Sequence, residues 1–170
     1  MTAARTSARV VLLDDDGAVL LLCGSDPAIT DGTAPRWWFT VGGQIQAGET
    51  LAEAAARELA EETGLRVDPR HLVGPVWRRD SIIDFNGAVI ASEEFYFVLR
   101  TRRFEPSAAT RTPLELRYIH AHRWCDSRVI AELNLGGQTV YPQQLGQLLA
   151  VANELAAGPG GPAADPQPIL

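Results

Sequence analysis

Acidic side chains gather in one short segment of this 170-residue chain, residues 43–65, which reads GQIQAGETLAEAAARELAEETGL. Within it, Glu58, Glu61 and Glu62 stand at positions i, i+3 and i+4. Residues with that spacing lie on one face of a helix, so the three carboxylates would point to the same side. Carboxylate oxygens are the ligands that Mg²⁺ and Mn²⁺ prefer in proteins. The spacing therefore predicts an oxygen-ligand site for a divalent cation.

A helix over residues 51–62 is predicted to carry these carboxylates. Thr50 followed three residues later by Glu53 is a capping box, which marks a helix start. The alanine-rich run that follows has high helix propensity, and Gly64 suits the left-handed conformation that ends a helix. The carboxylates then share the side that the helix uses for packing.

An acidic run is more commonly a solvated helix face, but the geometry argues against that alternative here. The three carboxylates repel one another, and Arg57 is the one basic residue between Glu49 and Leu65. Burial beside Leu51 would raise the pKa values of the carboxyl groups. Keeping them ionised then requires a cation of higher charge than arginine, so we favour a metal site.

The same segment satisfies every fixed position of the pattern G-x5-E-x7-R-E-U-x-E-E-x-G-U, where U is a bulky aliphatic residue. It thereby resembles the Nudix box, the signature of enzymes that hydrolyse a nucleoside diphosphate linked to another moiety. The nine matching residues are Gly43, Glu49, Arg57, Glu58, Leu59, Glu61, Glu62, Gly64 and Leu65.

This resemblance implies an α/β fold: an α/β/α sandwich with a mixed β-sheet and a loop-helix-loop catalytic motif. It also implies roles for the box residues. Glu58 and Glu62 match metal-ligand positions, and Glu61 matches a ligand or base position. In the family, the metal ions bridge the diphosphate and position a water, which one glutamate deprotonates for in-line attack on phosphorus. Which glutamate is the base varies among relatives and stays open.

Four further positions acquire expected roles from the resemblance. The carbonyl of Gly42 often contributes to the metal site, Glu49 supports it through water or a further metal, and Arg57 orients a glutamate. Glu94, early in a later strand, resembles the place where many relatives supply another glutamate to the metal or the base. The alternative for Glu94 and its neighbour Glu93 is a pair of solvated charges at a strand end.

Two residues depart from the usual surroundings of the box. Val41 stands where relatives commonly have proline, and Gln46 stands where they commonly have glutamate. Val41 affects only the rigidity of a turn. Gln46 removes one charge near the metal cluster, which bears on rate and on the number of bound ions rather than on the type of reaction.

Aromatic and arginine side chains are the candidates for binding substrate. The candidates to stack on a nucleobase are Trp37, Trp38, Trp77, Phe85 and Tyr96, and those to hold phosphates are Arg36, Arg78 and Arg79. Of these, Trp38, Arg36 and Arg78 are taken as the substrate-binding residues, although core packing and surface exposure are the ordinary roles of these residue types. The expected substrate is a nucleotide or a nucleotide derivative. A nucleoside triphosphate is favoured, and a nucleotide sugar or ADP-ribose comes next.

Other functions of the same fold are kept as alternatives. A non-catalytic Nudix-fold nucleotide-binding or sensor domain would be expected to have an eroded box, whereas this box is whole. An isoprenoid diphosphate isomerase would need a dedicated cysteine acid. Cys23 and Cys125 lie outside the box in apolar runs, where buried free thiols are the better interpretation.

Composition agrees with one enzyme domain that works on anions. The net charge of −6 argues against a protein that binds nucleic-acid backbones, and it implies that an anionic substrate arrives with a cation. Residues 1–9 are polar and the apolar run at 20–23 is short, so no signal peptide or membrane span is predicted. We expect a cytoplasmic protein.

Periodicity and turn residues predict the remaining elements. Strands are expected at residues 8–13 and 18–23, joined as a hairpin, at 37–41, at 73–85 and 88–99, joined through Asn86-Gly87, and at 117–125. Helices are expected at 127–133 and 142–157, and loops at 24–36 and 101–113. Residues 1–157 would form the Nudix hydrolase domain. The Pro/Gly-rich residues 158–170 are expected to be disordered, and a homodimer in which they pack against a partner subunit is left open.

Overall fold

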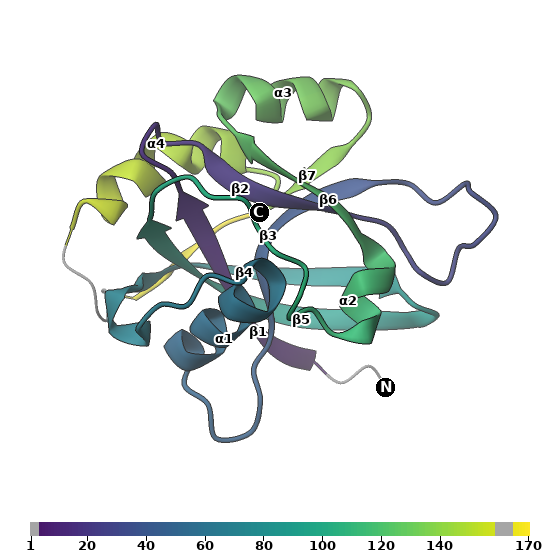
Figure 1. Cartoon of the computed structure of the whole chain (residues 1–170), viewed down its shortest axis with the longest axis horizontal. Helices are drawn as coiled ribbons and strands as arrows, with labels where there is room; N and C mark the ends of the chain where they lie inside the picture. The colour runs from purple at the N-terminus through teal and green to yellow at the C-terminus, as the bar shows by residue number, and fades with distance from the viewer. Residues whose placement is uncertain (1–3, 159–164) are drawn as a thin grey trace.

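The computed structural model describes residues 4–158 and 165–170, and these build a mixed sheet between two layers of helices (Figure 1). The sheet has eight strands in the order β6-β2-β3-β1-β5-β4-β8, with β7 paired to β3. The α/β/α sandwich expected from the sequence is therefore confirmed. The strands are β1 (Ala4–Leu13), β2 (Val19–Gly24), β3 (Trp37–Gln44), β4 (Val73–Phe85), β5 (Ala88–Arg100), β6 (Ile119–Cys125), β7 (Thr139–Tyr141) and β8 (Gln167–Pro168).

Helix α1 lies on one face of the sheet, and α3 and α4 lie on the other (Figure 1). In the described part of the chain, no helix is both long and apolar enough to cross a membrane. The helices are α1 (Leu51–Thr63), α2 (Pro113–Tyr118), α3 (Ser127–Leu135) and α4 (Leu145–Ala156), with a short 3₁₀ helix η1 (Pro69–His71).

Strand β1 lies inside the sheet and is apolar on both faces. Val10 and Leu12 point to the α1 side, whereas Val11 and Leu13 join the core that α3 and α4 cover. This alternation is what a strand buried between two helical layers requires. The predicted hairpin between β1 and β2 contributes little to the sheet, because Leu13 and Val19 are the residues that pair between these strands. Most pairing of β1 is parallel to β5 and antiparallel to β3.

The hairpin of β4 and β5 is present as predicted, with its turn at Asn86 and Gly87. Both residues have the positive φ that this turn needs, 51° and 80°. The backbone N–H of Asn86 donates to the Asp26 carboxylate at 2.9 Å. The hairpin tip is therefore attached to the loop that joins β2 and β3.

Several elements differ from the sequence-based expectation. Strand β3 continues through Gly42 and Gly43 to Gln44, because these residues pair with β1. Residues 113–118, expected as loop and strand, form helix α2, which begins with a capping box between Thr112 and Glu115. Strand β7 forms in a stretch for which no element was predicted, and α4 begins at Leu145 rather than Pro142.

The end of the chain differs from the disordered tail expected over residues 158–170. Residues 165–170 are placed against the domain, where β8 pairs in parallel with β4. The N–H of Ile169 donates to the Arg78 carbonyl at 2.9 Å, and the Ile169 side chain packs on the core beneath α3 and α4. The prediction of disorder considered only the proline and glycine content. It did not allow for an apolar residue, Ile169, that packs on the core at the edge of an open sheet. Residues 159–164 lie outside the described residues.

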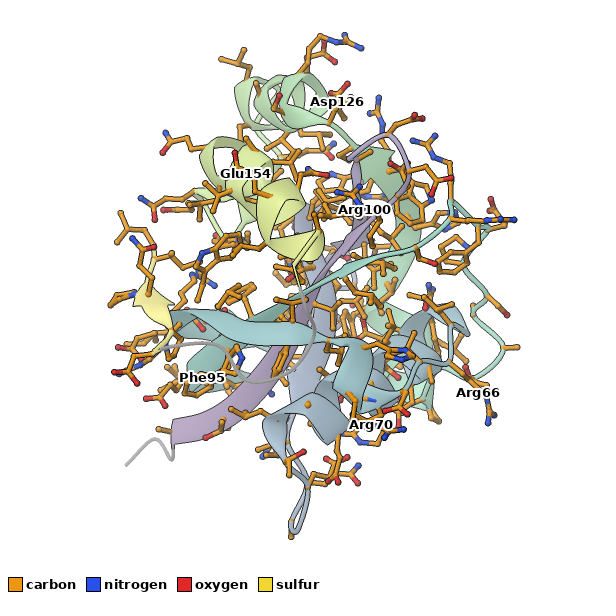
Figure 2. All side chains as sticks on the ribbon, turned by 90° about the vertical axis from the view of Figure 1, so that its left-hand side faces the viewer. Arg66, Arg70, Phe95, Arg100, Asp126 and Glu154 are labelled. Atoms are coloured by element: carbon orange, nitrogen blue, oxygen red, sulfur yellow. The ribbon has the colours of Figure 1, made fainter. Side chains whose placement is uncertain are left out.

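Arg100 anchors the start of the long loop that follows β5, and Figure 2 shows it beside α4. Its guanidinium donates to the Asp14 carbonyl at 2.8 Å and to the Asn153 side chain at 2.8 Å. Arg103 then forms an ion pair with the buried Asp14 carboxylate at 2.6 Å. The loop thus leaves the sheet from a fixed point on its way to α2.

Candidate active site

A cavity of about 980 Å³ opens beside the N-terminal end of β1 and is large enough for a nucleotide-sized ligand. Helix α1 contributes Glu58, Glu61 and Glu62 to its wall. Glycines of β3, the β4–β5 hairpin and α2 provide the other sides. The three carboxylates that the sequence singled out therefore face one cavity.

The capping box at the start of α1 helps to determine which way these glutamates point. The Thr50 hydroxyl accepts from the Glu53 N–H at 3.1 Å, and the Glu53 carboxylate accepts from the Thr50 N–H at 2.9 Å. Gly64 ends the helix with φ 81°. With the helix fixed at both ends, Glu58 and Glu62 are turned inward and keep 8% and 1% of their surface exposed.

Two glycines of β3 leave space beside α1 and β1, one for a carboxylate and one for the neighbouring strand. A Cβ atom on Gly43 would lie 2.6 Å from the Glu58 Oε1 atom, so a side chain there would displace this carboxylate. Gly42 has φ 146°, and a Cβ on it would meet the Ala8 carbonyl at 2.2 Å. The Gly42 N–H points to Glu62 Oε2 at 3.4 Å. Gly43 thus lets Glu58 approach β3, and Gly42 lets β3 approach β1.

Arg57 binds several of the acidic groups at once. It makes a two-point ion pair with Glu49, at 2.7 Å and 3.0 Å, and donates to the Gln44 carbonyl at 2.9 Å. Its third nitrogen donates to Glu58 at 3.0 Å and to Glu61 at 3.3 Å. The hydrogen bonds from Arg57 hold the pKa of Glu49 below its ordinary value. Arg57 therefore joins the loop before α1 to the helix and orients two carboxylates.

The negative charges of Glu58 and Glu62 are not balanced by the cationic side chains near them. Burial raises the pKa of Glu62 well above its ordinary value, and the neighbouring Glu58 adds to the effect. Burial also raises the pKa of Glu58, although Arg57 opposes the shift. The buried Glu62 Oε1 atom has no hydrogen-bond partner in the described residues. A hard divalent cation would satisfy this oxygen and balance both charges, so the donor set fits such an ion.

Glu115 of α2 is a fourth carboxylate at this site, and the sequence analysis did not identify it. Oxygen atoms of Glu58, Glu61 and Glu115 all lie within 4.8 Å of one another. The segment before α2 holds Glu115 there by capping the C-terminal end of α1. The Thr110 hydroxyl donates to the Ala60 carbonyl at 2.8 Å, and Arg111 donates to the Glu62 carbonyl at 2.9 Å.

Glu94 also lines the cavity, but arginines surround its carboxylate. Glu94 Oε2 accepts from Arg79 at 2.8 Å and from the Tyr96 hydroxyl at 2.7 Å, and Arg9 lies 3.5 Å from Oε1. Burial alone would raise the pKa of Glu94, yet the arginines outweigh it and the net shift is downward. Glu93 points to the other face of the strand and pairs with Arg78. The structure thus groups Glu94 with cations rather than with the other carboxylates.

The residues expected to bind substrate are only partly in the cavity. Arg36 lines it, whereas Trp38 is packed in the core, where its indole N–H donates to Gln138 at 2.7 Å. Arg78 faces away and pairs with acidic side chains on the outer surface. In both strands the neighbouring residue lines the cavity instead, namely Trp37 and Arg79. Successive side chains of a strand point to opposite faces, so a shift of one position exchanges them.

An aromatic cluster forms another part of the cavity wall. The ring of Phe85, at the tip of the β4–β5 hairpin, meets Trp37 edge to face at 6.5 Å and Tyr118 at 5.1 Å between centroids. These rings come from three different elements. Aromatic rings of this kind offer apolar faces on which a planar ring can stack.

The two cysteines are buried free thiols, as predicted, and neither lines the cavity. Burial raises the pKa of Cys125 to about 11 and also raises that of Cys23. At neutral pH both side chains are protonated thiols and therefore poor nucleophiles.

Sequence comparisons match this chain to a known domain family and to short stretches of curated proteins. The family model of the NUDIX domain matches residues 3–144. The chain is 51% identical over 39 residues to the oxidized purine nucleoside triphosphate hydrolase of Danio rerio, a stretch covering 23% of this chain and 25% of that protein. It is 53% identical over 36 residues to phosphatase NudJ of Escherichia coli K12, covering 21% and 24%. The chain thus spans about a quarter of the length of the curated relatives it matches.

Solved structures resemble the whole domain. The dihydroneopterin triphosphate pyrophosphohydrolase of E. coli superposes with a TM-score of 0.60 at 22% identity, covering 87% of this chain and 95% of that one. A MutT NUDIX hydrolase from Burkholderia pseudomallei gives a TM-score of 0.54 at 19% identity, covering 91% and 99%. Likeness at these identities shows a common fold.

Proposed function

The chain belongs to the NUDIX domain family, and from this membership we propose that it hydrolyses a diphosphate bond in a nucleoside diphosphate linked to another moiety. The proposed cofactor is Mg²⁺ or Mn²⁺. The observation that carries the proposal is the buried pair Glu58 and Glu62, whose unpartnered oxygen and raised pKa values call for a hard cation. The intact box in the sequence supports the same chemistry.

Glu58, Glu61 and Glu62 would hold the ion, with the Gly42 carbonyl as a further oxygen donor. That carbonyl accepts from Arg9 at 2.9 Å and keeps a second lone pair. When bound, the metal neutralises phosphate charge and activates water for attack on phosphorus. We propose that Glu94 positions Arg9 and Arg79 and does not bind the metal ion, because these two guanidinium groups already balance its charge.

The proton of the attacking water must pass to a carboxylate, and two candidates reach the same space. Glu61 is the most exposed of the three box carboxylates, with 29% of its side chain accessible. Glu115 has an oxygen within 4.8 Å of oxygens of Glu58 and Glu61 but belongs to another helix. Arg57 and Glu49 would act by positioning, since Arg57 holds Glu58 and Glu61 while Glu49 holds Arg57.

The favoured substrate is a nucleoside triphosphate, with a nucleotide sugar or ADP-ribose second. The rings of Trp37, Phe85 and Tyr118 would receive the base, and Arg36 would contact phosphate or sugar. The net charge of −6 supports a small anionic substrate over a nucleic acid. A cytoplasmic location and a homodimer are further proposals, and light scattering of the purified chain tests the second.

A phosphate-release assay over a nucleotide panel tests this function. Purified protein is incubated with each compound, then with pyrophosphatase and phosphatase, with and without Mg²⁺. We expect turnover of at least one triphosphate that requires the metal and is lost in Glu58→Gln. Glu132→Gln, at an exposed site on α3 where Glu132 pairs with Arg128, is the matched control. Metal-independent turnover, or equal rates in both variants, would contradict the proposal.

A further inference from the structure

Arginines occupy the cavity wall next to the carboxylate cluster. Arg5 and Arg9 of β1 and Arg79 of β4 all line the cavity, and Glu94 of β5 is the acid set among them. Strand pairing brings them together, because Ser7 and Arg79 both stand directly opposite Glu94. Residues at paired positions and two positions apart share a face. One sheet face therefore carries three arginines around one glutamate.

Arg79 is held rigidly in this face. One guanidinium nitrogen donates to Glu94 at 2.8 Å, and the guanidinium carbon lies 5.3 Å from the centre of the Tyr141 ring. The Tyr96 hydroxyl donates to the same Glu94 oxygen at 2.7 Å. A guanidinium has five N–H donors, and within the described residues Glu94 is the acid that Arg79 pairs with. Its remaining donors are available to a ligand in the cavity.

Arg5 adds a second donor group that is short of an acceptor. Its Nε atom is buried and has no hydrogen-bond partner in the described part of the chain. On this sheet face three guanidinium groups surround the carboxylate of Glu94, an excess of positive charge that Glu58 and Glu62 of the neighbouring cluster offset only from beyond ion-pair distance. Such an excess favours an anionic ligand, which satisfies donors and charge together.

The arginine group adjoins the carboxylate cluster through Gly42. Arg9 donates to the Gly42 carbonyl at 2.9 Å and lies 3.5 Å from Glu94, while the Gly42 N–H points to Glu62 at 3.4 Å. A phosphate chain bound at the carboxylates can therefore extend toward Arg9 and Arg79 within the same cavity. The substrate must carry negative charge where it meets them.

We propose that Arg79 and Arg5 bind a phosphate beyond the diphosphate that is cleaved, and that the substrate is therefore a nucleoside triphosphate. This inference rests on the proposed function. A nucleotide sugar would place a neutral sugar against these arginines and leave their charge unbalanced. The arginine group thus selects against the second candidate substrate.

Substrate pairs that share a base test this directly: GTP with GDP-mannose, and UTP with UDP-glucose. We expect a higher kcat/KM for each triphosphate. Arg79→Gln should lower kcat/KM for the triphosphate by roughly tenfold or more and that for the sugar nucleotide by less than about threefold. Arg78→Gln is the matched control, because Arg78 is the neighbour that faces away from the cavity. It should change neither substrate.

Arg5→Gln provides a second variant if Arg79→Gln fails to fold, and the same loss of selectivity is expected. Equal losses on both substrates, a wild-type preference for sugar nucleotides, or the same effect from Arg78→Gln would overturn the proposal. Calorimetry with α,β-methylene-GTP separates the subsite from hydrolysis. Binding that weakens about tenfold in Arg79→Gln supports the subsite even without turnover. Binding that is unchanged in Arg79→Gln and Arg5→Gln overturns it.

Discussion

Glu58 and Glu115 bring carboxylate oxygens within 4.8 Å of each other from two different helices. The approach depends on the segment before α2, whose Thr110 and Arg111 side chains bind the last carbonyls of α1. The site is therefore built from the box helix and from a later segment that docks on its end. Glu115 should contribute to catalysis as a ligand or as a base.

Glu115→Gln should reduce turnover by at least about tenfold at limiting Mg²⁺, because it removes one charge from the cluster. The fold should persist, since glutamine can replace glutamate in the capping box with Thr112. Steady-state rates across a Mg²⁺ titration, with thermal melting as the folding control, measure both effects. Rates equal to those of Glu132→Gln at every metal concentration would remove Glu115 from the site.

Glu58→Gln and Glu62→Gln should each lower turnover by roughly 10²-fold or more while the protein stays folded. Glu62→Gln should in addition raise the melting temperature of the metal-free protein by a few degrees, because it removes a buried charge beside Glu58. Mg²⁺ should stabilise the wild type and not this variant. Differential scanning fluorimetry with and without Mg²⁺ checks the prediction, and stabilisation of both proteins to the same extent would contradict it.

Helix α1 could be predicted because the residues that begin and end it lie within the segment itself. Contacts between residues far apart in the chain leave no such pattern in the sequence. Thr50, Glu53 and Gly64 define the helix within the segment itself. Glu115 reaches the site through a loop whose path depends on α1, although the capping box of Thr112 and Glu115 was readable in the sequence. The parallel pairing of β1 with β5 likewise joins residues far apart in the chain.

Choosing between neighbours in a strand was not possible from residue type. Trp37 and Trp38 are both tryptophan, and Arg78 and Arg79 are both arginine. The alternation of side chains along a strand therefore does not tell which residue of each pair faces the cavity. Only the register of the sheet decides that Trp37 and Arg79 face the cavity. Glu93 and Glu94 are a related case, because alternation places only one of them toward the site without saying which, and the arginine partners of Glu94 come from other strands.

The end of the chain should matter for stability and not for chemistry. Ile169→Ser should lower the melting temperature by roughly 3–6 °C, because Ile169 packs on the core and its loss removes about 1–2 kcal/mol. Leu170→Ser is the control, since Leu170 is 69% exposed. A chain ending at Ala157 should fold, melt at a lower temperature and keep wild-type turnover. Lost activity in that folded, shortened chain would mean that the tail contributes to the site.

Gln46→Glu should lower the Mg²⁺ concentration that gives half-maximal activity by several-fold, because it adds a charged oxygen at the cavity wall. Gln46 follows strand β3, which contains Gly42 and Gly43, and its N–H donates to Glu49 at 2.7 Å. Gln147→Glu, exposed on α4 and outside the cavity lining, controls for net charge. An unchanged metal titration would indicate that the side chain at position 46 points away from the cluster.

The function proposed for this site requires that water attack phosphorus within a diphosphate at the carboxylate cluster. Hydrolysis in ¹⁸O-labelled water, followed by mass spectrometry of the products, tests it most directly. We predict one ¹⁸O atom on a phosphate-containing product, with a nucleoside monophosphate as that product or as the other fragment, and only when Mg²⁺ or Mn²⁺ is present. Label on a sugar or base carbon, or a covalent enzyme intermediate, would contradict the account, and no turnover of any diphosphate would favour a nucleotide-binding sensor instead.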